Sequence, residues 1–124
     1  MMLLLDTRVF LWWRENSPRL STAARNAIAG SDVVFVSVAS AWEVAIKRWL
    51  GRIRLDEPFE RGIEESRFSK LAVSFEHADA VGGLAPHHSD PFDRMLLAQA
   101  RVENLTLVTH DRSFEPYGQP VIWS

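Results

Sequence analysis

The chain contains no cysteine and almost no lysine. Without Cys there can be no disulfide framework, thiolate metal site or cysteine nucleophile, so any chemistry has to come from oxygen and nitrogen atoms. A surplus of positive charge is also missing, since 16 acidic residues stand against 14 basic ones. This balance excludes a protein that holds nucleic acid by bulk charge. Only Lys47 and Lys70 are lysines; the other basic residues are arginines, which form the better fork for phosphate.

Long apolar runs are absent as well. The run from Met1 to Leu5 stops at Asp6 with no basic region before it, and no later stretch approaches the ~18 to 20 residues of a membrane span. We therefore expect a cytoplasmic protein without a membrane segment, whose first residues belong to the fold. With 47% hydrophobic residues, 6 Gly and 6 Pro, the composition is that of one globular domain spanning residues 1–124.

Short apolar runs alternate with segments of helical spacing. The runs predict strands buried on both faces of a parallel sheet, at 3–5, 33–36 and 105–108, with weaker candidates at 71–73 and 121–123. The helical segments cover 7–15, 21–29, 57–68, 76–84 and 91–103, and one more runs from residue 38 to Gly51. This alternation predicts an α/β domain with a mostly parallel sheet and right-handed crossovers.

Four acidic residues fall where the predicted strands end. Asp6 follows the first strand directly, and Asp111 follows the strand at 105–108. The helix before that strand runs antiparallel to it, so Asp93 in its first turn belongs at the same edge. Glu43 lies about six residues into the helix after the second strand, only ~9 Å along its axis. Ligands of such sheets bind at this carboxyl edge, where we expect the four acids to converge.

Each acid taken alone also has a structural explanation. Asp93 in a first helical turn favours the helix dipole, and Glu43 precedes Lys47 by four residues, as in a surface ion pair. Asp111 can be a turn residue. Asp6 is harder to explain, because an acid that closes a buried strand is costly unless it is solvated or liganded.

Convergence favours a bound cation, because gathered carboxylates repel one another and are rarely assembled for stability. Hard oxygen ligands without Cys point to Mg²⁺ or Mn²⁺ rather than Zn²⁺. Such a site suits phosphodiester hydrolysis, since the ion can generate hydroxide from water and neutralise the charge that gathers on phosphoryl oxygens. A site with two ions would hold them ~3.5 to 4 Å apart.

Four motifs occur in order along nearly the whole chain: Leu4-Leu5-Asp6-Thr7, Ser37-Val38-Ala39-Ser40-Ala41-Trp42-Glu43, Pro86-His87-His88-Ser89-Asp90-Pro91-Phe92-Asp93-Arg94, and Val108-Thr109-His110-Asp111. Any one of them is a weak signal, but four in order at the expected spacing are a strong one. Together they resemble the PIN-domain ribonucleases, and most closely the VapC-type toxins of bacterial toxin–antitoxin pairs.

The resemblance implies a three-layer α/β/α PIN-like domain that depends on Mg²⁺ or Mn²⁺ and cleaves RNA endonucleolytically. It further implies a VapB-like antitoxin whose peptide blocks the site, and we expect a homodimer. By the same resemblance, Thr109 supports an acidic quartet made of Asp6, Glu43, Asp93 and Asp111. Close relatives often carry His where this chain has Arg8, a difference that bears on substrate preference and leaves the quartet intact.

Several other residues have two explanations each. Asp90 is a helix N-cap or binds a metal-bound water. His87 and His88 form a plain polar loop or contact phosphate or metal. A basic cluster at the end of the Glu43 helix is a solvated face or an RNA or antitoxin contact; it consists of Lys47, Arg48, Arg52 and Arg54. Helical spacing favours core or dimer packing over base stacking for four tryptophans, Trp12, Trp13, Trp42 and Trp49.

We interpret the chain as a metal-dependent endoribonuclease of the toxin type. One alternative is a catalytically inactive PIN-like interaction module that binds a basic partner peptide or RNA with its acidic pocket; the complete quartet argues against it. Another is a phosphotransfer enzyme or receiver with Asp6 as nucleophile. That alternative is weak, because Asp6-Thr7-Arg8 lacks a second acid two residues on and no lysine lies near the last strands.

Overall fold

The computed structural model describes all residues from 1 to 124 and contains a five-stranded parallel sheet in the order β3-β2-β1-β4-β5. The strands are β1 (Met2–Leu5), β2 (Val33–Ser37), β3 (Ser69–Leu71), β4 (Thr106–Thr109) and β5 (Val121–Trp123). The helices are α1 (Thr7–Arg14), α2 (Thr22–Gly30), α3 (Val38–Trp49), α4 (Phe59–Glu65), α5 (Phe75–Gly82) and α6 (Pro91–Val102), followed by the short 3₁₀ helix η1 (Arg112–Tyr117).

The first strand, β1, is the central strand of the sheet, because it pairs with β2 on one side and with β4 on the other, and one more strand lies beyond each. Leu3, Leu4 and Leu5 are completely buried, and Leu5 lies opposite Val36 of β2 and Val108 of β4. This is the environment that a continuous apolar run predicts. The residue after Leu5 therefore emerges at the carboxyl edge of the sheet, between two other strand ends.

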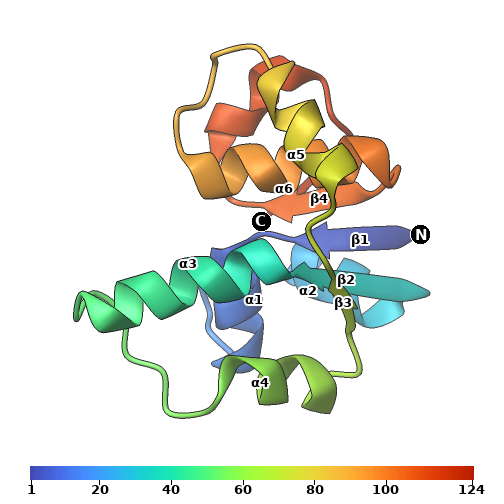
Figure 1. The fold of residues 1–124 in the computed structure, drawn as a ribbon. Coiled ribbons are helices and arrows are strands. Elements are labelled where there is room, and N and C mark those ends of the chain that lie inside the picture. Colours follow the sequence, from blue (N-terminus) through green and yellow to red (C-terminus); the bar gives the residue numbers. More distant parts are fainter.

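Helices cover both faces of the sheet (Figure 1). On one face Leu3 and Leu5 pack with Phe10 of α1 and Ile28 of α2. On the other face Leu4 packs with residues of α6 such as Leu96 and with η1. Figure 1 shows α5 and α6 on one side of the strands and α1 and α4 on the other. The expected three-layer α/β/α arrangement with a parallel sheet is confirmed.

Two elements differ from the prediction. The edge strand β3 covers Ser69–Leu71 instead of 71–73, because an edge strand with one open side accepts polar residues such as Lys70. The 3₁₀ helix η1 was not expected, since Pro116 inside it breaks any helical spacing. No helix in the structure combines the length and the apolarity needed to cross a membrane.

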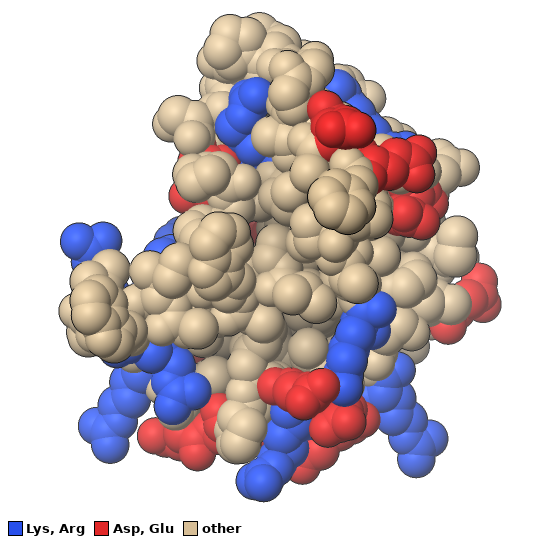
Figure 2. Space-filling model, viewed as in Figure 1, with Lys and Arg blue, Asp and Glu red and all other residues tan.

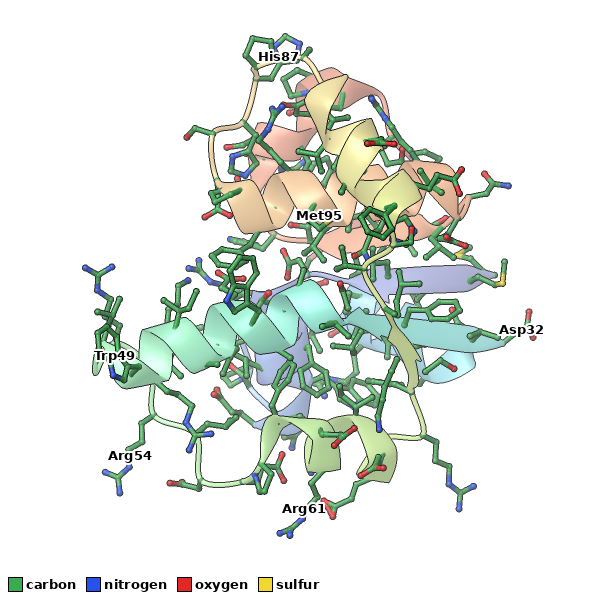
Figure 3. All side chains as sticks on the ribbon, in the orientation of Figure 1. Asp32, Trp49, Arg54, Arg61, His87 and Met95 are labelled. Atoms are coloured by element: carbon green, nitrogen blue, oxygen red, sulfur yellow. The ribbon has the colours of Figure 1, made fainter.

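The four predicted tryptophans also differ in burial, and two of them do not lie in the core. Trp12 is buried in the core and Trp13 is partly buried. Trp42 and Trp49 are 63% and 86% exposed, so core packing is wrong for these two. The side of α3 that faces the viewer in Figure 2 is mostly free of charge. Trp42 packs edge-on against Phe92 of α6, with 5.2 Å between the ring centroids, and Trp49 projects from the end of the helix in Figure 3. The buried residues of α3 instead include Glu43 and Val44.

Candidate metal centre

A cleft of about 860 Å³ opens at the carboxyl edge of the sheet. Asp6, Glu43, Asp93 and Asp111 all line it, although they come from four separate segments of the chain. His88, Asp90 and Arg8 lie in the same cleft. The fold thus brings all four of the predicted acids together, with Asp90 and Arg8 beside them.

Asp6 ends β1 and at the same time caps α1. Its Oδ1 accepts a hydrogen bond from the Val9 backbone N–H at 2.7 Å, and its Oδ2 accepts one from the Thr109 hydroxyl at 2.5 Å. Burial raises the pKa of Asp6 to about 6, even though both hydrogen bonds and nearby Arg8 favour the ionised form. The cost of desolvating this carboxylate therefore outweighs the stabilisation of its charge by the two hydrogen bonds and by Arg8.

Glu43 is also buried, with only 6% of the residue exposed. The Thr7 hydroxyl donates to its Oε1 at 2.6 Å, and the Lys47 ammonium donates to its Oε2 at 2.7 Å. The expected pair with Lys47 is present, but it is not an ordinary surface pair, because the carboxylate lies inside the cleft. The Lys47 ammonium group therefore fixes the position of the Glu43 carboxylate.

Asp93 is the acid with the least support. Asp90 caps α6 by accepting the Asp93 backbone N–H at 2.9 Å, so the capping role belongs to Asp90. Burial raises the pKa of Asp93 to about 7, and the charges of Asp90, Asp6 and Glu43 add to the effect. The charge of His88, whose Nε2 lies 3.0 Å from Oδ2, opposes the shift, and no hydrogen bond reaches either oxygen of Asp93.

Asp111 follows β4 and begins η1. Its Oδ1 accepts the Ser113 backbone N–H at 2.9 Å, as a turn residue would, and its backbone N–H donates to the Thr109 hydroxyl at 3.0 Å. Burial alone would raise its pKa, but hydrogen bonds from Ser113 and His88 hold the pKa below its ordinary value. Asp111 therefore serves the turn and the cleft together.

The two loop histidines have different positions. Nε2 of His88 lies 3.0 Å from Oδ2 of Asp93 and 3.0 Å from Oδ2 of Asp111. The ligand atoms of these three residues lie within 4.8 Å of one another. His87 is exposed, stacks edge-on against Tyr117 and projects from the outer end of the loop in Figure 3. Sequence reasoning could not separate the two, since nothing in a polar loop says which ring turns inward.

This donor set fits a hard divalent cation. Asp6, Glu43, Asp93, Asp111 and the imidazole of His88 are among the residues that line one cleft, where burial, and after it the neighbouring negative charges, raises the pKa of Asp6 and of Asp93. Oxygen-rich sites of this kind suit Mg²⁺ and Mn²⁺. The free Oδ1 of Asp93 is the oxygen best able to accept such an ion.

Arginines surround the acids in the cleft. Arg8, Arg19, Arg52 and Arg112 all line it, and none of them forms an ion pair with a carboxylate. The Arg112 guanidinium lies 4.2 Å from the centre of the Trp123 ring, a cation–π contact that orients it.

The predicted basic cluster at the end of α3 divides between the cleft and solvent. Of its four members only Lys47 and Arg52 reach the cleft. Arg48 is exposed outside it, and Arg54 projects into solvent in Figure 3, 3.6 Å from Asp56. The solvated-face explanation therefore holds for the outer pair.

The amino-acid sequence of this chain is similar to those of known proteins. The PIN domain family model matches residues 3–119. The chain is 32% identical to Ribonuclease VapC22 of Mycobacterium tuberculosis over 123 residues, which is 94% of this chain and 92% of that protein.

Solved structures share the fold at lower identity. A DNA-bound VapBC complex from Salmonella typhimurium has a TM-score of 0.68 at 19% identity, covering 98% of this chain and 97% of that one. A toxin–antitoxin complex from Klebsiella pneumoniae has a TM-score of 0.68 at 18% identity, covering 97% and 95%. VapC20 of Mycobacterium tuberculosis, a sarcin–ricin loop cleaving toxin, has a TM-score of 0.63 at 14% identity, covering 94% and 95%.

Proposed function

The chain belongs to the PIN-domain family and to its VapC-type ribonucleases, and from this premise we propose that it hydrolyses RNA phosphodiester bonds as a metal-dependent endoribonuclease. One observation carries the proposal. Four acids from separate segments meet in one cleft, where burial and, after it, the neighbouring acids raise the pKa of Asp93; a structure built only for stability would keep these acids apart.

We assign metal binding to Asp6, Glu43, Asp93 and Asp111, with Mg²⁺ or Mn²⁺ as the ion. When bound, the ion supplies a Lewis acid that lowers the pKa of water and neutralises charge on the phosphoryl oxygens. Thr109 supports the site by donating to Asp6, and Asp90 supports it by capping the helix that carries Asp93. No separate general base is needed in this scheme.

The residues of the cleft divide the remaining work. Thr7 and Lys47 hold both oxygens of Glu43, and Val9 and Thr109 hold both oxygens of Asp6, so these carboxylates are oriented before any ligand arrives. Such prior orientation removes reorganisation from the reaction. The carboxylates also supply the negative charge that retains the cation against water.

RNA is the substrate class that the arginines around the cleft favour. Arg8, Arg19, Arg52 and Arg112 have no carboxylate partner, so their guanidinium groups are free to pair with phosphates on either side of the cleaved bond. A local ring of arginines does this without a net positive charge on the whole chain. Arg8 belongs to this set, in the position where close relatives often have His.

The biological setting we propose is a toxin–antitoxin pair. The Salmonella typhimurium and Klebsiella pneumoniae structures are complexes of this kind. For this chain we propose a VapB-like antitoxin that places a basic side chain among the acids of the cleft, and a homodimer as the assembled form. We further propose that residues 1–124 act as a single domain, because both core clusters share the central strand β1.

Cleavage of RNA by the purified chain tests the proposed function. We expect fragments from total RNA in Mg²⁺ or Mn²⁺, complete loss of cleavage in EDTA, and poor restoration by Ca²⁺, whose coordination is looser. Mapping the fragment ends gives the cleavage sequence. Full activity in EDTA would contradict the metal mechanism, and RNA or peptide binding without cleavage in any metal would favour the inactive interaction module.

A further inference from the structure

We propose that His88 is a positioning residue that joins Asp93 to Asp111 and thereby sets how tightly the cleft binds its cation. This inference rests on the proposed function, because it concerns the same metal centre. It assigns a role to a residue outside the acidic quartet. The geometry that points to it has three parts: the contacts of the ring, the lack of any other link between the two acids, and the way the loop is anchored.

The contacts of the ring identify it as a hydrogen-bond donor. Nδ1 accepts the backbone N–H of Asp90 at 3.4 Å, which leaves the ring proton on Nε2. Nε2 forms a hydrogen bond with Oδ2 of Asp111 at 3.0 Å, and Oδ2 of Asp93 lies at the same distance from Nε2. To coordinate a metal through Nε2, the ring would have to move its proton to Nδ1, directly against the Asp90 N–H. The arrangement therefore favours a ring that donates to Asp111 and lies against Asp93 over a ring that binds the metal.

No other side chain joins these two acids. Asp93 stands in the first turn of α6 and Asp111 in the turn after β4, and the remaining contacts of Asp111 lead to Ser113 and Thr109. Like charges on separate elements move apart unless something holds them. With His88 on Oδ2, Asp93 keeps Oδ1 free, so the ring fixes the carboxylate without covering the oxygen that a cation needs.

Several hydrogen bonds and one aromatic contact anchor the loop that carries His88. The segment 83–90 has no regular secondary structure. The Arg94 guanidinium donates to backbone carbonyls of that loop and of the end of α5; these belong to Val81, Leu84, Ala85 and His88. The His88 backbone N–H donates to the Tyr117 hydroxyl at 2.9 Å, and its ring packs edge-on against Phe114.

Arg94 follows Asp93 directly in the sequence, so one helical turn supplies both the acid and the anchor of the loop. A shift of the loop moves His88, and a shift of His88 releases Asp93. Outer partners that orient metal ligands typically change metal affinity by about 10 to 100-fold when they are removed. We expect an effect of that size here.

Direct Mn²⁺ binding, measured by titration calorimetry and by electron paramagnetic resonance, tests the role of His88 without reference to cleavage. We expect H88A to bind Mn²⁺ about 10 to 100-fold more weakly than the wild type. H88Q should recover much of the affinity, because the Gln side-chain amide can donate from nearly the place of Nε2. The exposed neighbour supplies the matched control, and H87A should bind as the wild type does.

The possible outcomes separate the two proposals. Wild-type protein that binds no Mn²⁺ contradicts the proposed function. Tight wild-type binding that H88A leaves within about twofold contradicts the role of His88 alone. A ¹⁴N coupling to bound Mn²⁺ that is present in the wild type and lost in H88Q would make His88 a ligand, which also overturns the positioning role. If H88A does not fold, H88F takes its place, because it keeps a ring against Phe114 but has no N–H to donate, and Mn²⁺ binding by H88F within about twofold of the wild type overturns the proposal.

Discussion

The two halves of the acidic cleft are held in different ways. In the core half, made of Asp6 and Glu43, each of the four carboxylate oxygens accepts a hydrogen bond from the protein. In the loop half, made of Asp93 and Asp111, the link between the acids is a single histidine ring, and the oxygens of Asp93 accept no hydrogen bond. The core half is built by the sheet and its helices; the loop half depends on one loop.

This difference separates stability from activity within one site. Substitutions that remove donors from the core half leave a buried carboxylate oxygen unpaired, which costs stability. Removing the charge of Asp93 in the loop half relieves desolvation and repulsion, so the fold gains stability while the chemistry is lost. Three changes, taken from the largest expected effect to the smallest, can break or sharpen this comparison.

The largest effect is expected from Asp93→Asn. The amide keeps the shape of the side chain but loses the charge that a cation needs, so RNA cleavage in Mg²⁺ should fall by more than about 100-fold, beyond the loss typical of an outer partner. The melting temperature in EDTA should hold or rise, because the costly charge behind the raised pKa is gone. Cleavage rates and thermal melts on the same preparations check both statements.

Asp90→Asn is the control for this change, since Asn caps a helix about as well as Asp and leaves the cap on the Asp93 N–H in place. An Asp93→Asn protein that is less stable but fully active would remove Asp93 from the site and restore the simple helix-dipole explanation. Such a result would also remove the contrast between the two halves.

The core half could be largely predicted from the sequence. Leu3 to Leu5 form a continuous apolar run, and a parallel sheet places whatever follows such a run at its carboxyl edge, so the position of Asp6 follows from local pattern and topology alone. Asp90 before Pro91 marks the start of α6 in the same local way. These inferences need only neighbours in the chain and one rule of sheet geometry.

The loop half and the outer surface could not be predicted in this way. The inward turn of His88 depends on Arg94 and Tyr117, which are distant partners that no local spacing reveals. The edge strand β3 shifted because burial on one side only relaxes the apolar pattern. Trp42 shares the helical stripe that predicts core packing, yet α3 turns it outward because Glu43 and its neighbours need the inner face.

The pH dependence of stability offers a second test, with an effect of a few kcal/mol. Burial raises the pKa of Asp93 from 3.8 to about 7, so between these values the folded state holds a proton that the unfolded state has released. The folded state then binds more protons, and the free energy of unfolding falls as the pH rises from about 4 to about 7. Asp6, with a pKa of about 6, adds a smaller fall over a narrower window.

Urea denaturation in EDTA at several pH values measures this fall, and the difference between wild type and Asp93→Asn isolates the share of Asp93. The variant should lose most of the decline and keep the part due to Asp6. Asp111 provides the internal contrast. Its pKa is lowered in the folded state, so its charge stabilises the fold at pH values above the ordinary pKa of an aspartate. Equal pH profiles for the two proteins would mean that Asp93 carries no unusual cost.

The smallest effect is expected from Thr109→Val in the core half. Thr109 is completely buried; its hydroxyl donates to Oδ2 of Asp6 and accepts the backbone N–H of Asp111. Val has nearly the same volume, so the change leaves both groups unpaired without opening a cavity, and stability should fall by about 1 to 3 kcal/mol. Thr106→Val on the same strand is the matched control, because the Thr106 side chain makes no hydrogen bond and the loss there should be much smaller. If Thr109→Val and Thr106→Val have the same melting temperature, the hydrogen bonds of the core half do not stabilise the fold, and the two halves of the cleft differ only in position.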